Sequence, residues 1–290
     1  MQHLVDIDDL TPLDIEKILE DAKAFKRKMP PKLLINKLII TLFFEPSTRT
    51  RSSFEVAAKR LGAFVVHLDP AKSSTKKGET LEDTFANLAA MGPDGVIVRH
   101  SQNNTARVLA DMNLVPVINA GTGKLAHPTQ ALLDLFTIKE YFKDIKGKNI
   151  TIVGDIANSR VANSGIKLFQ RAGLNITLVA PKEFMPNTNL PNTPSLEEGI
   201  KEADIIMSLR AQLERHAKPI FEDYNEYAKH YCIKKEHLKK GVVVMHPGPV
   251  MRNIDISDEV LESKNSLVLE QVKNGVFIRM AILKHILLDN

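Results

Sequence analysis

The sequence predicts an α/β fold of two domains, each a parallel sheet flanked by helices, with long helices joining the two domains. Short apolar runs rich in β-branched residues alternate with segments of helical periodicity along almost the whole chain. The alternation forms two series, which meet near residues 130–145. The length of 290 residues is long for one hydrophobic core and suits two domains of ordinary size.

The first series opens with a helix expected over 11–28. Residues 38–44 form an apolar run that predicts a strand buried on both faces. The helix after it is expected from Arg49 onward, because Phe54, Ala57, Ala58 and Leu61 recur at helical spacing and Gly62 can end it. Further strands are expected at 64–68, 95–98 and 115–119, and further helices at 81–91, 105–112 and 129–142.

The second series predicts strands at 149–153, 175–179, 204–208 and 242–245, and helices at 159–172 and 195–203. The segment 181–194, rich in proline and asparagine, is expected to be a loop without a pattern of its own. A last helix over 272–288 is apolar on most faces, so we expect it to return and pack across the first domain. The expected domains are residues 1–133 with 272–290, and residues 134–271.

Composition excludes several classes of protein. The 39 basic and 35 acidic residues give a formal charge of +4, which is too small and dispersed to indicate a nucleic-acid or membrane partner. The single cysteine, Cys232, excludes an intramolecular disulfide and leaves no cysteine cluster for zinc. The first residues lack the pattern of a secretory signal, and no segment has the length of a membrane span, so a cytoplasmic location is expected.

An anion-binding motif is expected between the first strand and its helix, at Ser47-Thr48-Arg49-Thr50. A helix start presents free N–H groups and the positive end of the helix dipole, both of which favour a phosphate. The hydroxyl groups can donate to phosphate oxygens, and Arg49 can add a bidentate pair. Taken alone, the pattern also fits an ordinary helix cap with a solvated arginine beside it.

Polar residues follow the other predicted strands, and this joint pattern favours a binding site. In the first series they are Arg99, His127 and Gln130, and in the second series Arg160, Arg210, Gln212, Pro247 and Gly248. Ligands of open parallel sheets bind at the carboxyl ends of the strands, so both sets are expected around one cleft. Many arginines with few carboxylates indicate an anionic substrate that carries phosphate and carboxylate groups.

The hydroxylated and basic segment 73–80 is a candidate loop that closes over an anion, although a solvated surface turn fits its composition equally well. Motifs for other cofactors are incomplete. The segment after Gly154 lacks the later glycines of a dinucleotide fingerprint, and Gly123-Lys124 lacks the rest of a P-loop. No histidine pair has metal-ligand spacing with a third ligand nearby, so neither a cofactor nor a metal is expected.

Together the motifs resemble the aspartate/ornithine carbamoyltransferase family. Residues 43–51 resemble its carbamoyl-phosphate motif and residues 127–130 its second signature. Within the family the lysine-bearing loop and the segment 246–249 are similar to the aspartate-specific chains, although Gly248 stands where the family often has leucine or alanine. The resemblance implies transfer of a carbamoyl group from carbamoyl phosphate to L-aspartate without a metal, as the committed step of pyrimidine synthesis.

The resemblance also implies a role for each candidate residue. Ser47, Thr48, Arg49, Thr50 and Arg99 would hold the phosphate. His127, with Arg99 and Thr50, would point at the carbamoyl oxygen, and Gln130 and the backbone at Pro247 and Gly248 would hold the carbamoyl amino group. Arg160, Arg210 and Gln212 would bind the carboxylates of aspartate. Ser73, or its neighbour Ser74, and Lys77 would come from the neighbouring subunit of a homotrimer, while association with regulatory or dihydroorotase chains is left open.

Two other functions compete with this interpretation. A transferase acting on ornithine would need an acidic partner for the second amine, whereas the second-series candidates are Arg160 and Arg210. A non-catalytic anion-binding protein would keep the phosphate loop but could lose His127, Gln130 or Lys77, and this chain has all three.

Overall fold

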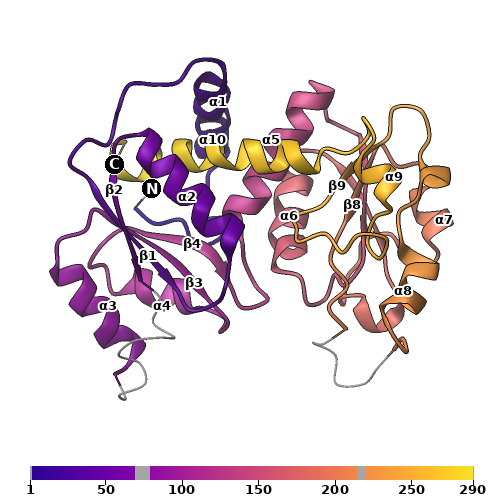
Figure 1. Ribbon diagram of the computed structural model, residues 1–290, viewed down its shortest axis with the longest axis horizontal. Helices are drawn as coiled ribbons and strands as arrows, with labels where there is room; N and C mark the ends of the chain where they lie inside the picture. The colour runs from indigo at the N-terminus through magenta and orange to yellow at the C-terminus, as the bar shows by residue number, and fades with distance from the viewer. Residues whose placement is uncertain (1, 69–78, 214–219, 290) are drawn as a thin grey trace. The chain divides into compact units, whose positions relative to one another are not determined.

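The computed structural model describes residues 2–68, 79–213 and 220–289 (Figure 1). The chain divides into two compact units. Unit 1 comprises Met1–Phe136 and Val272–Asn290, and unit 2 comprises Thr137–Gln271. Each unit contains its own sheet, and the segments Pro128–Phe142 and Val268–Leu287 are helices that continue from one unit into the other.

The sheet of unit 1 has the strand order β2-β1-β3-β4, and every pairing in it is parallel. Its strands are β1 (Leu38–Phe43), β2 (Phe64–Leu68), β3 (Gly95–His100) and β4 (Val117–Thr122). The central strands β1 and β3 are mostly apolar, and Ile39–Phe43 of β1 and Gly95–Val98 of β3 are buried, as a sheet covered on both faces requires. Because the four strands are parallel, their carboxyl ends lie along one edge of this sheet.

Helices cover both faces of this sheet (Figure 1). They are α1 (Pro12–Arg27), α2 (Thr48–Arg60), α3 (Leu81–Ala90), α4 (Thr105–Asp111), and the unit 1 parts of α5 (Pro128–Phe142) and α10 (Val268–Leu287). On one face, Phe85 of α3 and Leu109 of α4 pack in one buried cluster with Ile40, Val96 and Val117 of the strands. Thr11 begins α1 with a capping box in which its side chain and that of Asp14 each accept a backbone N–H.

The end of α10 is fixed to α1 by polar side-chain contacts. Lys284 Nζ lies 2.7 Å from Asp21 Oδ2, and His285 Nε2 lies 3.1 Å from Asp14 Oδ1. Near the other end of α1, Lys26 Nζ donates to Asn274 Oδ1 at 2.8 Å. The apolar residues of α10 from Phe277 to Leu283 are buried, which explains why its sequence is apolar on most faces.

The sheet of unit 2 has the order β7-β6-β5-β8-β9 and is also parallel. Its strands are β5 (Asn149–Val153), β6 (Asn175–Val179), β7 (Asn192–Thr193), β8 (Ile205–Ser208) and β9 (Val243–Met245). The described residues of this unit include the helices α6 (Arg160–Arg171), α7 (Leu196–Ile200), α8 (Tyr224–Tyr231) and α9 (Asp258–Leu261). Tyr227 of α8 is fully buried, and this burial raises the pKa of its phenol well above the ordinary value.

Several element boundaries differ from the expectation. Strand β4 continues through Gly121 to Thr122, where a loop was expected, because Thr122 pairs with His100 of β3. The segment 181–194 contains the 3-10 helix Lys182–Phe184 and the short strand β7, which pairs with Leu178 and Val179 at the sheet edge. None of the helices in the described part of the chain is long and apolar enough to cross a membrane.

Candidate functional site

Three loops with predicted site residues lie along one edge of the unit 1 sheet. The loop after β1 leads to Ser47 and α2, the end of β3 carries Arg99, and the loop after β4 leads to His127. Because β1, β3 and β4 are adjacent and parallel, their carboxyl ends meet at the same edge. The fold thus brings the sequence motifs of unit 1 together.

The start of α2 differs from an ordinary capped helix. Ser47 is the N-cap residue, but its side chain makes no capping hydrogen bond. Only its carbonyl oxygen is used, accepting from Arg51 N at 3.1 Å. The hydroxyl of Ser47 is therefore not committed to the helix, and this observation favours an anion site over a simple cap.

The hydroxyl and guanidinium groups of the motif have different surroundings. Thr48 and Arg49 are exposed, whereas Thr50 is buried. The guanidinium of Arg49 lies close enough to the protein for desolvation to lower its pKa below the ordinary value. An arginine whose hydration is reduced in this way gains more from pairing with an anion than a fully hydrated one.

Arg99 is held in place by partners from strand β4 and from the loop after β1. Its Nη1 donates to the carbonyl oxygen of Ala120 at 3.1 Å, and its Nε lies 3.4 Å from Glu45 Oε2. Its backbone oxygen accepts from Phe44 N at 2.9 Å. Glu45, which the sequence analysis did not single out, therefore positions an arginine of the candidate site.

The loop that carries His127 is organised by the buried amide of Asn119. Asn119 Oδ1 accepts from Gly121 N at 2.8 Å, and its Nδ2 donates to Thr122 Oγ1 at 3.1 Å and to Val5 O at 2.8 Å. His127 is itself buried and precedes the first residue of α5. Gln130, also buried, lies in the first turn of that helix and donates to Asp134 Oδ1 at 3.0 Å.

The remaining described candidates lie along one edge of the unit 2 sheet. Arg160 begins α6 after β5, Arg210 and Gln212 follow β8, and Pro247 and Gly248 follow β9. Since β5, β8 and β9 are adjacent and parallel, these loops share a sheet edge. Arg160 is buried, Arg210 is half-buried, and Gln212 Nε2 donates to Asn158 O at 3.4 Å.

A glycine permits two of these loops to approach. Gly154 has a φ of +123°, and an added Cβ there would lie 2.8 Å from the carbonyl oxygen of Leu209. No side chain fits against a backbone oxygen at that distance, so the loop after β5 can pass beside the loop after β8 only with glycine at this position. The same residue's N–H donates to Val179 O at 3.1 Å.

One buried carboxylate, that of Asp255, connects the loops after β8 and β9. Its Oδ1 accepts from Ala211 N at 3.2 Å, between the two candidate residues of that loop. Its Oδ2 accepts from Met251 N at 2.9 Å and lies 3.1 Å from His246 Nε2. His246 Nδ1 accepts from Gly248 N at 2.8 Å, so the proton of a neutral imidazole lies on Nε2, facing Asp255. The sequence analysis missed Asp255 as a positioning residue.

The backbone conformation at position 248 explains why glycine stands there in place of leucine or alanine. Gly248 has a φ of +71°, a conformation that residues with a side chain adopt only with strain. Glycine therefore adopts this backbone conformation without the strain that leucine or alanine would bring. Ser73, Ser74 and Lys77 lie outside the described residues.

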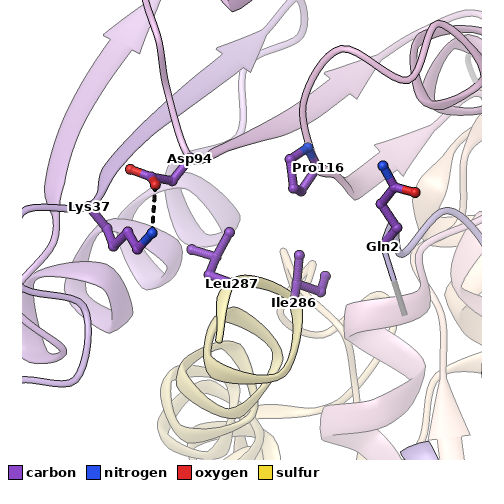
Figure 2. Close-up of a pocket in the computed structure, with 6 residues that line it drawn as sticks. All are labelled: Gln2, Lys37, Asp94, Pro116, Ile286 and Leu287. Carbon is purple, nitrogen blue, oxygen red and sulfur yellow. Dashed lines mark hydrogen bonds and ion pairs between the residues drawn. The ribbon is translucent and has the colours of Figure 1, made fainter. Parts of the chain in front are cut away.

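A pocket of about 440 Å³ lies at the opposite edge of the unit 1 sheet, away from the predicted site (Figure 2). Its lining residues include Lys37, Asp94 and Pro116, which immediately precede β1, β3 and β4. Lys37 Nζ donates to Asp94 Oδ1 at 2.8 Å, and Asp94 Oδ2 accepts from Leu38 N at the same distance. These charges fix the beginnings of the strands, and we assign no ligand to this pocket.

Groups of three or more histidine, cysteine, aspartate or glutamate side chains placed to hold a metal ion do not occur within residues 2–68, 79–213 and 220–289. The one cysteine, Cys232, is buried, and desolvation raises the pKa of its thiol to about 11. A thiol in such surroundings is a poor nucleophile at neutral pH.

Two family models match the chain in succession. Residues 2–140 match the model described as "Aspartate/ornithine carbamoyltransferase, carbamoyl-P binding domain". Residues 146–286 match the model described as "Aspartate/ornithine carbamoyltransferase, Asp/Orn binding domain".

Full-length relatives show the same similarity. An aspartate carbamoyltransferase catalytic subunit from Sulfurovum sp. (strain NBC37-1) is 65% identical over 100% of this chain and 99% of the relative. Among solved structures, an aspartate transcarbamoylase from Trypanosoma cruzi in complex with carbamoyl phosphate and aspartate is 30% identical, with a TM-score of 0.90 and coverage of 99% and 97%. An ornithine carbamoyltransferase from Thermus thermophilus is 27% identical, with a TM-score of 0.89 and 99% of both chains covered.

Proposed function

The chain belongs to the aspartate/ornithine carbamoyltransferase family, and we propose that it transfers the carbamoyl group of carbamoyl phosphate to the amine of L-aspartate. The products would be N-carbamoyl-L-aspartate and phosphate. The solved relatives include enzymes for both aspartate and ornithine, so the fold does not choose between the two amines. The 65% identity with an aspartate carbamoyltransferase catalytic subunit and the residues at the unit 2 sheet edge support aspartate.

The observation that carries the proposal is the cationic, hydroxyl-rich edge of the unit 1 sheet. Ser47 makes no side-chain capping bond, Arg49 and the first N–H groups of α2 follow β1, and Arg99 lies near the carboxyl end of the adjacent strand β3. Such an arrangement suits a phosphate better than a carboxylate, because many donors can surround its oxygens. In the proposal this edge binds the phosphate of carbamoyl phosphate.

The reaction forms a C–N bond between the aspartate amine and the carbamoyl carbon and breaks the bond from that carbon to the phosphate oxygen. A tetrahedral intermediate with a negative oxygen lies between the two states. Donors from Arg99, His127 and Thr50 would stabilise that oxygen, and Arg49 would stabilise the leaving phosphate. The amine must react uncharged, and the leaving phosphate is the proposed acceptor of its proton.

The choice of aspartate rests on two arginines of unit 2. Arg160 begins α6 and Arg210 follows β8, so both project from the same sheet edge as Gln212. Two guanidinium groups complement the two carboxylates of aspartate. Ornithine would instead bring a second cation toward these arginines, and that approach would be repulsive.

This choice can be tested with inhibitors that carry only part of each amino acid. Succinate has both carboxylates of aspartate but no amine, and 1,4-diaminobutane has both amines of ornithine but no carboxylate. We expect succinate to inhibit product formation competitively against aspartate, and 1,4-diaminobutane at the same concentration and ionic strength to have no effect. Competitive inhibition by the diamine instead would contradict the assignment of Arg160 and Arg210.

We further propose that the chain acts as a homotrimer in which the neighbouring subunit completes the site with Ser73 and Lys77. The edge strand β2 supports an interface between subunits. Its residues Phe64 and Val66 are 64% and 43% exposed, an unusual exposure for aromatic and β-branched side chains of a sheet. In the sequence, β2 ends at Leu68, five residues before Ser73.

Mixing inactive variants tests the shared site. Arg49→Ala and Lys77→Ala chains should each keep little activity alone, but a mixed trimer contains one site with Arg49 from one chain and Lys77 from the other. Dissociating and reassociating the two variants together should therefore restore part of the activity. If mixed trimers are verified by mass and stay inactive, Lys77 does not act across the interface.

Pyrimidine synthesis as the pathway and the cytoplasm as the location belong to the same proposal. They are supported by the aspartate carbamoyltransferase relatives and by the lack of cysteine pairs.

A further inference from the structure

We propose that Asp134 is a positioning residue that sets the orientation of the Gln130 amide, and that the buried Arg279 supports it in this role. This inference rests on the proposed function, because it concerns how Gln130 recognises the amino group of carbamoyl phosphate. The two residues lie one helical turn apart on α5, and the hydrogen bond between them is 3.0 Å long from Nε2 to Oδ1.

The two ends of the Gln130 amide have opposite hydrogen-bonding character. Its NH₂ group only donates, and its oxygen only accepts. An ionised carboxylate only accepts, so Asp134 can bind the NH₂ end and not the oxygen. The acceptor oxygen, Oε1, is consequently left to face a donor. The amino group of carbamoyl phosphate is such a donor, whereas a reversed amide would present NH₂ to it and repel it.

A buried cation accompanies the carboxylate of Asp134. Asp134 is fully buried, and the guanidinium of Arg279 on α10 is also buried and interacts electrostatically with it. Burial lowers the pKa of Arg279 to about 10, and the negative charge of Asp134 opposes this decrease. Arg279 therefore stays protonated at neutral pH and supplies the positive charge that a buried carboxylate requires.

Packing holds Arg279 in place beside α5. Its Nη1 donates to Gly275 O at 3.1 Å, and its guanidinium carbon lies 5.0 Å from the centre of the Phe54 ring on α2. Gly275 permits this arrangement, because an added Cβ would lie 2.6 Å from Arg279 Nη1 and 3.2 Å from Leu133 Cδ2 of α5. Residues of the rigid helices α2, α5 and α10 thus fix Arg279 and, through Asp134, the side chain of Gln130.

Selectivity between two acyl phosphates tests this role more sharply than activity does. Acetyl phosphate has the same phosphate and carbonyl groups as carbamoyl phosphate but carries a methyl group in place of the amino group. A hydrogen-bond acceptor at Gln130 can bind the amino group of carbamoyl phosphate, but acetyl phosphate offers it no donor. We would measure the dissociation constants of carbamoyl phosphate, acetyl phosphate and inorganic phosphate by calorimetry, for the unaltered chain and for Asp134→Asn.

Asparagine at position 134 can either donate or accept, so it no longer selects one orientation of Gln130. We expect carbamoyl phosphate to bind about tenfold more weakly, the scale of one hydrogen bond, while acetyl phosphate and inorganic phosphate change less than twofold. A parallel loss of affinity for all three ligands would show a merely structural role and overturn the inference. Unchanged affinity for all three would overturn it as well.

A charge-swapped variant provides the rescue. In the double variant Gln130→Glu with Asp134→Asn, the asparagine NH₂ can donate to the introduced glutamate, whose other oxygen still presents an acceptor, and the net charge is unchanged. The double variant should regain selectivity for carbamoyl phosphate that Asp134→Asn and Gln130→Glu each lose. If the folded double variant regains no selectivity for carbamoyl phosphate, the role of Asp134 is contradicted. If Asp134→Asn alone does not fold, the double variant is compared with Gln130→Glu, and the same outcome contradicts the role.

The outcomes also separate this inference from the proposed function. Absence of carbamoyl aspartate formation by the unaltered chain would count against the function itself. An active unaltered chain whose selectivity is insensitive to Asp134→Asn would overturn only the positioning role.

Discussion

Replacing Arg49 with alanine is expected to lower kcat for carbamoyl transfer about 10²- to 10³-fold, the effect of removing one charged donor from a transition state. Arg49 lies in the first turn of α2, where the free N–H groups and the helix dipole already favour an anion. The leaving phosphate gains negative charge as the C–O bond breaks, so the lost guanidinium affects the transition state more than the bound substrate.

The measurement is steady-state kinetics with both substrates varied, combined with thermal unfolding to confirm that the variant is folded. Lys59→Ala is the matched control, because Lys59 is a cation in the last turn of the same helix with a side chain 62% exposed. The control should keep its activity, since its pair with Glu55 is a surface pair of small energy. Near-normal turnover of Arg49→Ala would remove the basis of the phosphate assignment.

Replacing Arg210 with alanine should raise the KM for aspartate about 10²-fold, because a charged pair to one carboxylate is lost. Arg210 lies between Leu209 and Ala211, whose backbone N–H groups bind Val153 O and Asp255 Oδ1. That rigid backbone directs the arginine, and its loss is not easily compensated by movement of the loop. Affinity for inorganic phosphate should stay within twofold, since the residues proposed to bind phosphate belong to unit 1.

Titrations with aspartate and with phosphate on the same preparation separate these effects. Arg171→Ala provides the control, as Arg171 is an exposed arginine in the last turn of α6, the helix that begins with Arg160. An unchanged KM for aspartate in Arg210→Ala, or an equal loss of phosphate affinity, would contradict the division of roles between the two sheets.

The fold was predictable from sequence wherever burial alone determines the element. The apolar runs at β5 and β6 predicted these strands to the residue, because most of their apolar side chains are buried. Elements fixed by pairing were missed. The end of β4 depends on Thr122 opposite His100, and the two residues of β7 become a strand only beside β6. Neither the end of β4 nor β7 shows a periodic spacing of apolar residues that would predict a strand.

The candidate site was predictable in a similar, partial way. Polar residues directly after apolar strands indicated the two sheet edges, and the resemblance to a family assigned their roles. The residues that position these polar side chains could not be identified from the sequence. Asp255 lies 44 positions from Ala211, to which it is hydrogen bonded, and Asp134 looked like one more polar residue of a helix. Their importance depends on burial and long-range contacts, which a local pattern does not contain.

The most direct test of the account is product formation by the purified chain, supplied with carbamoyl phosphate and either L-aspartate or L-ornithine, and followed by mass spectrometry. We predict N-carbamoyl-L-aspartate from the first mixture and no carbamoylated product above the uncatalysed background from the second. Carbamoylation of ornithine alone would keep the family and the phosphate edge but contradict the roles of Arg160 and Arg210, and no product from either amine would contradict transfer altogether.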